Sequence, residues 1–229
     1  VKIAIQGELG AYSHIAAERL YKDADIKTCS TFEETFKQAY NNPSYKIIIP
    51  IENSLAGRVA DIHYLLPKYK LQIHGEYFLP VEHNLLGKPD ATIEDIKYVR
   101  SHAQAISQCQ NIISKRKFKP IISVDTAGSA KDLAEGKDKT VAAIASDLSA
   151  KMYSLKILEK NIEDEKGNVT RFLIMGKNIE QPEFTPSKKF ITSCIFRLKS
   201  EPSALYKCLG GFATNQVNLT KLESFSVKN

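Results

Sequence analysis

Short apolar runs, each followed by a polar residue that can start a helix, recur through the first 150 residues. Apolar runs of roughly four to eight residues between turn signals are typical of strands buried on both faces, as in parallel sheets covered by helices. The alternation predicts an α/β fold. The expected strands are residues 2–6, 26–29, 47–49, 99–100, 120–124 and 141–145, and the helix starts include Ser13, Ser30 or Thr31, Asp125 and Ser146.

The order of these units predicts two lobes. From Leu71 to Leu86 the pattern becomes one long extended segment, which we interpret as a crossover into a second lobe. A later strand over residues 172–175 would return the chain to the first lobe. The predicted domain therefore covers residues 1–180, with residues 1–75 and 165–180 in one lobe and residues 80–160 in the other.

A smaller α+β domain is expected after a proline-containing linker at residues 181–188. Residues 191–198 are predicted as a strand, residues 203–212 as a helix and residues 217–222 as a strand, the start of a βαβ unit. The sequence ends at this point. Residues 189–229 are therefore expected to hold only a truncated part of this second domain, and such a part would expose an unpaired sheet edge.

Composition excludes several classes of function. Net charge is +6, but residues 181–229 hold 7 Lys and Arg against 3 Asp and Glu, and residues 1–180 are nearly neutral, so no nucleic-acid partner is expected. No apolar run reaches the roughly 20 residues of a membrane span, and the chain begins with a strand pattern, so we expect a cytoplasmic protein without a membrane partner. The four cysteines lack CxxC pairs and metal-site spacing, so free thiols are expected and no metal site is predicted.

Two segments near the ends of predicted strands suggest an anion-binding cleft. The turn Gly7–Gly10 leads into a helix whose N-terminal N–H groups could bind an anion, with Ser13 as a candidate cap. Glu52, Asn53 and Ser54 directly follow an apolar strand, at the end of the strand where ligands bind in open α/β sheets. An ordinary polar turn would also explain this segment.

The segment Asn168–Phe172 adds a hydroxyl, a guanidinium and an aromatic ring within three residues, Thr170, Arg171 and Phe172. Such a set suits a small anionic molecule that carries a ring. Taken alone, Arg171 could equally be a surface charge and Phe172 a core residue.

Six motifs in order give the chain a close resemblance to prephenate dehydratases with a C-terminal ACT regulatory domain. The motifs are GELGAYSH from Gly7, IENSLAGRV from Ile51, SHAQAISQC from Ser101, DTAGSA from Asp125, AAIAS from Ala142 and NVTRF from Asn168, and the ACT part is matched by residues 202–224. The resemblance implies a fold like type II periplasmic binding proteins. It also implies a cofactor-free reaction in which prephenate loses water and CO2 to give phenylpyruvate, a step in phenylalanine biosynthesis.

The resemblance also assigns site residues. Thr170 is implied as the residue most directly tied to catalysis, and Arg171 and Phe172 as contributors to substrate binding. The same motifs give the pocket candidates Asn53, Ser101 and Gln108, with Tyr12, Ser13, Ser54 and Thr126 as further substrate-binding candidates.

Two hypotheses remain for how the substrate's hydroxyl is helped to leave as water. In the first, Thr170 donates only a hydrogen bond as charge develops on the leaving oxygen, because a threonine hydroxyl is a poor general acid. Alternatively, Glu52 or His102 supplies the proton and Thr170 positions the substrate. Structural hydrogen bonds are the simpler expectation for His14 and His102.

For the C-terminal part, the resemblance implies that phenylalanine binds between subunits and inhibits the enzyme, which predicts a homodimer or homotetramer. The implied effector-binding residues are Ala204, Leu205, Asn218, Leu219, Glu223 and Ser224. The family pattern has Gly where Ser203 stands, and an arginine is absent after Glu223–Ser224. Two rival functions are open, an arogenate dehydratase and a non-catalytic module that binds a small anion.

Overall fold

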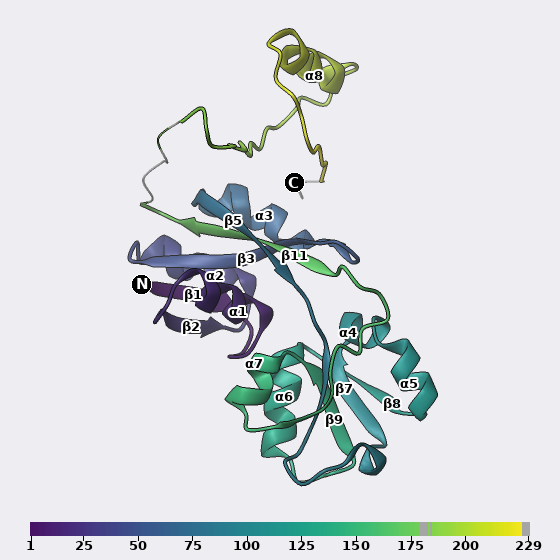
Figure 1. Ribbon diagram of the computed structural model, residues 1–229. Coiled ribbons are helices and arrows are strands. Elements are labelled where there is room, and N and C mark those ends of the chain that lie inside the picture. The colour runs from purple at the N-terminus through teal and green to yellow at the C-terminus, as the bar shows by residue number, and fades with distance from the viewer. Residues whose placement is uncertain (179–182, 184, 226–229) are drawn as a thin grey trace. The chain divides into compact units, whose positions relative to one another are not determined.

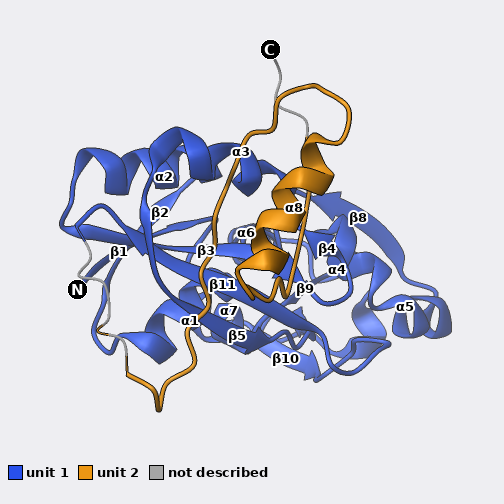
Figure 2. Ribbon diagram, turned by 90° about the horizontal axis from the view of Figure 1, so that it is seen from above, with its two compact units in different colours: residues 1–181 blue, residues 182–229 orange. Residues whose placement is uncertain are grey.

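The chain forms two compact units in a computed structural model, residues 1–181 and residues 182–229 (Figure 2). The structure describes residues 1–178, 183 and 185–225. The division at residue 181 lies beside the predicted start of the linker. Within the described residues, no helix is long and apolar enough to cross a membrane.

The first lobe of unit 1 is a mixed sheet in the order β2-β1-β3-β11-β5, with β4 added to β3 (Figure 1). Strands β1, β2 and β3 are parallel, whereas β11 runs antiparallel between β3 and β5. The strands are β1 (Lys2–Gln6), β2 (Asp25–Cys29), β3 (Tyr45–Asn53), β4 (Gly57–Arg58), β5 (Gln72–Pro80) and β11 (Val169–Gly176), and the helices are α1 (Tyr12–Leu20), α2 (Phe32–Asn41) and α3 (Ala60–Tyr69).

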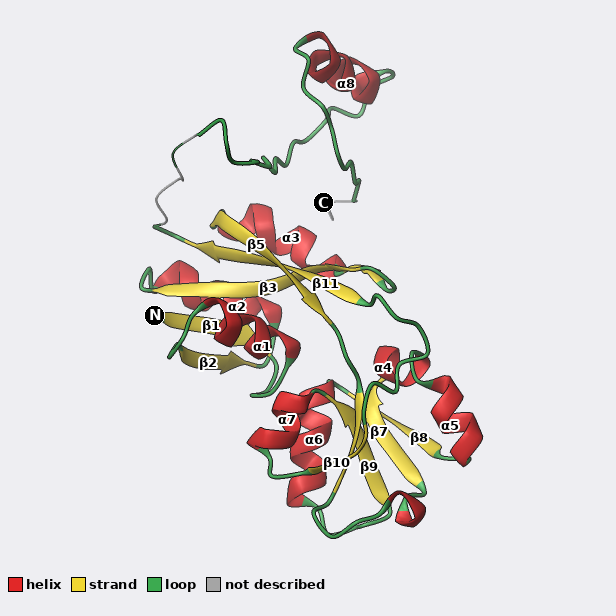
Figure 3. Ribbon diagram, in the orientation of Figure 1, coloured by secondary structure: helices red, strands yellow, loops and turns green. Residues whose placement is uncertain are grey.

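The second lobe is a five-stranded sheet in the order β10-β6-β9-β7-β8, flanked by short helices (Figure 3). Its strands are β6 (Asn84–Gly87), β7 (Tyr98–His102), β8 (Lys119–Ser123), β9 (Val141–Ala145) and β10 (Lys156–Glu159), and its helices are α4 (Ala103–Ser107), α5 (Gln110–Arg116), α6 (Thr126–Glu135), α7 (Asp147–Met152) and the 3₁₀ turn Ile93–Asp95.

Two crossings join the lobes, as predicted. The first lies between β5 and β6, and the second leads from β10 back to β11. A mixed α/β fold with two lobes is therefore confirmed. The crossover segment is not one strand, however, because residues 81–83 separate β5 from β6.

Apolar runs form strands here because both faces of each sheet are covered. In β3, Ile47 and Ile49 pack in one core cluster, and Ile48 packs in another on the opposite face. All three are fully buried. Burial on both faces explains why the run is continuously apolar and not alternating.

Side-chain caps begin several of the predicted helices. Thr31 accepts a hydrogen bond from the Glu34 N–H, Asp125 from Gly128 and Ser146 from Ser149, which satisfies N–H groups that the first helical turn leaves unpaired. The prediction for Ser13 was wrong. Ser13 lies inside α1, and Nδ1 of His14 instead accepts from the Gly10 N–H at 2.9 Å.

Several elements of unit 1 differ from the prediction. Helix α3 and strand β10 were not expected, and the single helix predicted up to Lys115 is broken between α4 and α5. The break is stabilised by Asp164, whose carboxylate accepts from the N–H groups of Gln110 at 2.7 Å and Asn111 at 3.0 Å. A cap from a distant segment cannot be read from local sequence.

Unit 2 contains helix α8 (Ala204–Thr214), close to the predicted helix. The strands predicted at residues 191–198 and 217–222 are not formed in the described residues. An extended segment becomes a strand only when a neighbour completes its hydrogen bonds, and neither segment pairs with another here. An ACT-like sheet in this unit therefore stays a prediction.

The turn after β1 contacts the second lobe directly. The carbonyl oxygen of Gly10 accepts from the hydroxyls of Ser146 at 2.7 Å and Ser149 at 3.0 Å, and the Tyr153 hydroxyl donates to the Leu9 carbonyl at 2.8 Å. This turn is thus a third connection between the lobes besides the two crossings. Its backbone needs a glycine, since Gly10 has φ +91°.

Gly10→Ala should lower the free energy of unfolding by about 2–5 kcal/mol. The added Cβ would lie 2.6 Å from Ser149 Oγ, so overpacking of about 1–3 kcal/mol adds to the left-handed strain of about 1–2 kcal/mol. Gly57→Ala is the matched control, because Gly57 has φ +77° but nothing within 4 Å of the added atom. Urea unfolding of both variants measures the difference, and equal losses would contradict the packing role of Gly10.

Candidate functional site

Thr170 lies where the end of β3 meets the start of β11. It pairs with Asn53 on one side and with Leu79 of β5 on the other. Its side chain is buried, with 9% exposure. The predicted neighbours Asn53 and Thr170 are therefore brought together by strand register, although they are 117 residues apart in sequence.

The side-chain amide of Asn53 has a fixed orientation. Its Oδ1 accepts from the backbone N–H groups of Leu55 at 3.1 Å and Ala56 at 2.9 Å, so Nδ2 must face the other way. Nδ2 donates to Thr170 Oγ1 at 2.9 Å and to Asn168 Oδ1 at 2.6 Å. Two backbone N–H groups thus determine which atoms of the site donate and which accept.

This orientation leaves the Thr170 hydroxyl with a hydrogen to donate. Its oxygen accepts from Asn53, and no described protein group accepts its O–H. A hydroxyl held in this way presents a hydrogen-bond donor to whatever molecule approaches it.

Asn168 extends the network to the second lobe. Because its Oδ1 accepts from Asn53, its Nδ2 is the donor, and it reaches Gln108 Oε1 at 3.0 Å. Gln108 is the residue that ends α4. Hydrogen bonds between side-chain amides therefore join the two lobes, and each amide donates to the next, from Asn53 to Asn168 to Gln108.

Ser54 holds the loop after β3 against the start of β11. Its hydroxyl donates to the Gly167 carbonyl at 3.1 Å and accepts from the Val169 N–H at 2.9 Å. The Ser54 N–H also donates to the Val169 carbonyl at 2.9 Å. These bonds shape the entry to β11, and both hydrogen-bonding roles of the hydroxyl are used.

A cavity of about 660 Å³ opens beside Gln108, between the loop after β3 and helix α4. Pockets of roughly 300–1,000 Å³ are usual for small ligands. Its lining residues are Leu55, Ala56, Ala103, Gln104, Ser107, Gln108, Asp164 and Glu165.

Arg171 and Glu52 lie on the opposite face of the sheet from Thr170. Successive residues of a strand point to opposite faces, and Glu52 pairs with Arg171 in register. The Arg171 guanidinium bonds to Glu76 Oε2 at 2.6 and 2.7 Å and lies 5.9 Å from the Phe78 ring centroid. The structure does not bring Arg171 or Glu52 together with Thr170.

Phe172 shares the face of Thr170 but is 1% exposed. It packs in the core cluster that includes Ile3, Ile5 and Ile48. The ring supports the strand beneath Thr170. A direct contact between Phe172 and a substrate ring stays a prediction that this packing does not favour.

The remaining candidates divide into two groups. Tyr12 donates to the Glu82 carbonyl at 2.8 Å or to His83 Nδ1 at 2.9 Å, and through His83 it connects to Gln108. The others are not joined to this network by any described hydrogen bond: Ser101, which donates to the Ile144 carbonyl at 2.7 Å, Ser13 within α1, and Thr126, the first residue of α6.

The two histidines with expected structural roles behave as predicted. His14 accepts from the Gly10 N–H, and burial lowers the pKa of its ring. His102 is the N-cap residue of α4, and its Nδ1 accepts from the Gln104 N–H at 3.3 Å. Both rings therefore stabilise helix starts.

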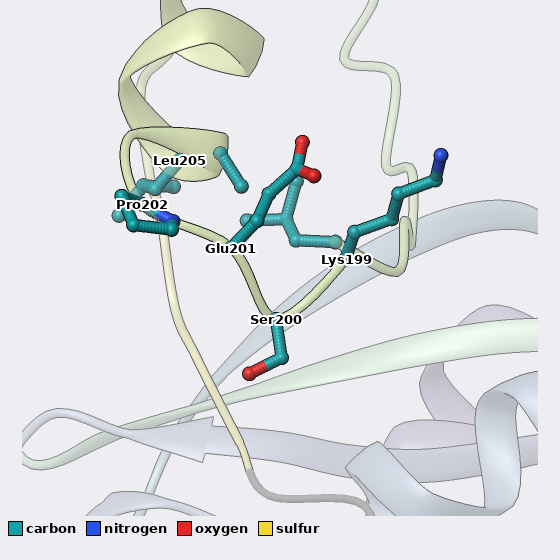
Figure 4. A pocket seen from close by; sticks show the side chains of 7 residues that line it. Lys199, Ser200, Glu201, Pro202 and Leu205 are labelled. Atoms are coloured by element: carbon teal, nitrogen blue, oxygen red, sulfur yellow. The ribbon is translucent and has the colours of Figure 1, made fainter.

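The effector-binding candidates lie in unit 2. Ala204 and Leu205 line a hollow of about 420 Å³ at the turn before α8, with Pro202 beside Leu205 (Figure 4). Asn218, Leu219, Glu223 and Ser224 follow α8 and are not among the residues that line this hollow. Glu223 pairs with Lys221 at 3.3 Å.

Sequence reasoning missed two members of the network. Asn168 stands two residues before Thr170, and the two-residue period of a strand could have placed it on the same face. His83 carried no local signal beyond its position in an extended segment. Its partners come from α1 and α4, which only the tertiary structure brings to it.

Comparison with known proteins identifies the family. The family described as prephenate dehydratase matches residues 3–180. The chain belongs to the prephenate dehydratase family. It is accordingly an enzyme of the carbon–oxygen lyase class that acts in phenylalanine biosynthesis.

Curated relatives support this membership. The chain is 40% identical over 221 residues to a prephenate dehydratase of Methanocaldococcus jannaschii, covering 94% of this chain and 79% of that protein. It is 40% identical over 226 residues to a bifunctional N-acyl-homoserine lactone acylase/prephenate dehydratase of Komagataeibacter europaeus, covering 99% and 80%. An arogenate dehydratase/prephenate dehydratase of Arabidopsis thaliana is 40% identical over 98% of this chain, which spans 58% of that protein.

Solved structures agree. A prephenate dehydratase from Arthrobacter aurescens in complex with L-Phe aligns at 26% identity with TM-score 0.85, over 99% of this chain and 76% of that one. A structure described as a novel type of quorum-quenching acylase aligns at 38% identity with TM-score 0.85, over 100% and 82%.

Acidification from pH 7 to pH 5 should lower the free energy of unfolding. Burial lowers the pKa of His14 and His83 in the folded state, so the unfolded chain binds more protons below its histidine pKa of about 6.5. Each histidine contributes up to about 1.4 kcal/mol per pH unit until its folded pKa is reached. Urea unfolding across this range measures the slope. His14→Asn should make the slope shallower, and greater stability at pH 5 would contradict the account.

Proposed function

We propose that the chain converts prephenate to phenylpyruvate, water and CO2, with the Thr170 hydroxyl as the hydrogen-bond donor to the departing oxygen. The observation that carries this proposal is the bond from Asn53 Nδ2 to Thr170 Oγ1, because it leaves the Thr170 hydrogen available. No cofactor is needed. Electrons from the carboxylate's C–C bond enter the ring as CO2 leaves, and the C–O bond breaks with its electrons on oxygen. The departing hydroxide, hydrogen-bonded by Thr170, takes up one proton from solvent and becomes water.

The chemistry of prephenate defines what the site must provide. The substrate is a dianion with a cyclohexadienol ring, and formation of the aromatic ring supplies most of the driving force. The enzyme has mainly to orient the substrate, exclude water and stabilise the leaving oxygen. The cavity beside Gln108 has a suitable size, and Gln108 borders it within the same network as Thr170.

A donor role for Thr170 is better supported than an acid at Glu52 or His102. The pKa of a threonine hydroxyl is far above the range that suits general acids, but a preorganised donor stabilises developing charge without transferring a proton. Glu52 belongs to the other face of the sheet, and the His102 ring caps α4. We therefore assign proton delivery to neither residue.

For Arg171 we propose a supporting role. Its guanidinium forms two bonds with the Glu76 carboxylate, and both side chains are partly buried. This ion pair ties β11 to β5 behind Thr170, so Arg171 would keep the strand in register. Other hydrogen-bond donors would then bind the carboxylates of the substrate.

Arogenate is a second candidate substrate. It carries an ammonium group where prephenate has a keto group, and two carboxylates, Asp164 and Glu165, line the cavity. Asp164 is already bonded to two backbone N–H groups, whereas Glu165 is exposed. Parallel assays with both substrates decide the preference.

Unit 2 is proposed to be part of an ACT module that binds phenylalanine and joins subunits in a homodimer or homotetramer. It exposes many large apolar side chains, as an unpaired interface would: Phe190, Ile191, Ile195, Phe196, Leu198, Leu205, Tyr206, Val217, Leu219 and Leu222. The relative solved with L-Phe supports phenylalanine as the effector. We propose the cytoplasm as the site of action.

Thr170→Val should lower kcat for prephenate at least 100-fold and change KM little. Valine has the same shape without the hydroxyl, and losing one preorganised donor typically costs about 100- to 1,000-fold in kcat. Thr170→Ser keeps the hydroxyl and should retain most of the activity. Phenylpyruvate absorbance is the assay. A Thr170→Val enzyme with normal kcat would overturn the role of Thr170, and a wild-type enzyme that releases no phenylpyruvate would overturn the substrate.

Phenylalanine should bind the full-length protein and lower its kcat/KM for prephenate. Isothermal titration measures binding, with alanine as the control ligand. Leu205→Asp introduces a charge into the hollow before α8 and should abolish the response to phenylalanine while basal turnover is kept. Absence of both binding and inhibition in the wild type would refute phenylalanine control.

A further inference from the structure

His83 is buried at the crossing between the lobes, in the segment that joins β5 to β6. Its side chain is 3% exposed. The backbone fixes its position, since its N–H donates to Glu163 Oε2 at 2.9 Å and its carbonyl accepts from the Ile162 N–H at 2.8 Å. The ring is therefore held between α1 and the end of α4, where it contacts Tyr12 and Gln108.

The tautomer of His83 follows from the direction of the amide network. Asn53 makes Asn168 Oδ1 an acceptor, and Asn168 Nδ2 then donates to Gln108 Oε1. Gln108 Oε1 also lies 2.9 Å from His83 Nε2, so this ring nitrogen must carry a hydrogen. Nδ1 is left without a hydrogen, as an acceptor that faces the Tyr12 hydroxyl at 2.9 Å; this hydroxyl also lies 2.8 Å from the Glu82 carbonyl oxygen. Burial also lowers the pKa of His83, which keeps the ring neutral at pH 7.

The same geometry determines which end of Gln108 faces the cavity. Its Oε1 accepts from two donors, one on each side, His83 and Asn168. Its NH₂ group has no acceptor among the described protein groups, and Gln108 lines the cavity. With both donors in place, rotation of the amide by 180° would oppose NH₂ to two N–H groups, which is strongly unfavourable.

We propose that His83 is a positioning residue whose Nε2–H fixes the side-chain amide of Gln108, so that the Gln108 NH₂ is presented to an anionic group of the substrate. This inference rests on the proposed function. The His83 ring does not touch the substrate. His83 acts through Gln108. The segment between β5 and β6, which holds His83, therefore belongs to the support of the binding site.

Two amide substitutions at residue 83 test the proposal, because they keep polarity and differ in reach. A glutamine amide can place its NH₂ near the position of the histidine Nε2, whereas asparagine reaches only the position of Nδ1. His83→Asn should raise KM for prephenate about tenfold or more, the order expected when a hydrogen bond to a charged group is lost, with a small change in kcat. His83→Gln should restore KM to near the wild-type value.

Further measurements separate positioning from general damage. Adding His83→Asn to a Gln108→Ala enzyme should produce no additional rise in KM, because the positioned amide is already gone. His74→Asn, at an exposed position of strand β5, is the control for an equivalent histidine substitution outside the network. Additive effects in the double variant, or equal KM values for the two substitutions at residue 83, would overturn the proposal.

Nitrogen NMR of the free enzyme tests the tautomer without substrate. We expect a protonated Nε2 and an unprotonated Nδ1 for His83 at pH 8, and the opposite tautomer would overturn the proposal. Together with the kinetic measurements, the NMR result shows whether the proposed function or the role of His83 fails. If the tautomer is as expected but the wild-type enzyme does not consume prephenate, the proposed function fails; if prephenate is consumed and His83→Asn leaves KM unchanged, the role of His83 fails.

Discussion

The two hydrogen bonds from the Leu55 and Ala56 N–H groups to Asn53 Oδ1 determine the polarity of the whole site. Backbone N–H groups can only donate, so they fix one side-chain amide, and that amide fixes the next. In this way the orientation of Asn53 in the first lobe determines the orientation of Gln108 in the second. The hydrogen bonds between the members of the chain form only in this orientation, as expected for a polar network held in a low-dielectric interior.

Strand β11 brings this network to one place. It runs antiparallel between β3 and β5, so its first residues meet the last residues of β3 exactly where the chain returns from the second lobe. Because successive residues of a strand point to opposite faces, neighbouring residues of β11 have different partners. Thr170 and Asn168 take part in the network, whereas Arg171 forms an ion pair with Glu76 on the other face. Thr170 and Arg171 are adjacent in sequence and therefore take part in different interactions, one on each face of the sheet.

Much of this fold could be predicted from the sequence, because its strands and helix starts carry local signals. Ile47–Ile49 is continuously apolar, and Thr31, Asp125 and Ser146 are good caps. Long-range partners could not be predicted in the same way. Asp164 ends the expected long helix by capping α5, and His83 meets Gln108 only after both lobes have formed. The expected grouping of Thr170, Arg171 and Phe172 did not take the alternation of a strand into account, which places Arg171 on the other face, and the roles of these residues toward a substrate stay predictions.

The central claim is that Asn53 makes Thr170 a donor, and Asn53→Asp tests it most directly. Aspartate can still accept from Leu55 and Ala56 but cannot donate, so the Thr170 hydroxyl would donate to the carboxylate and not to the substrate. The measurement is kcat/KM for prephenate in Asn53→Asp, Thr170→Val and the double variant. The account predicts that the double variant loses no more than the worse single variant. Losses that multiply would show that the two side chains act independently and would contradict it.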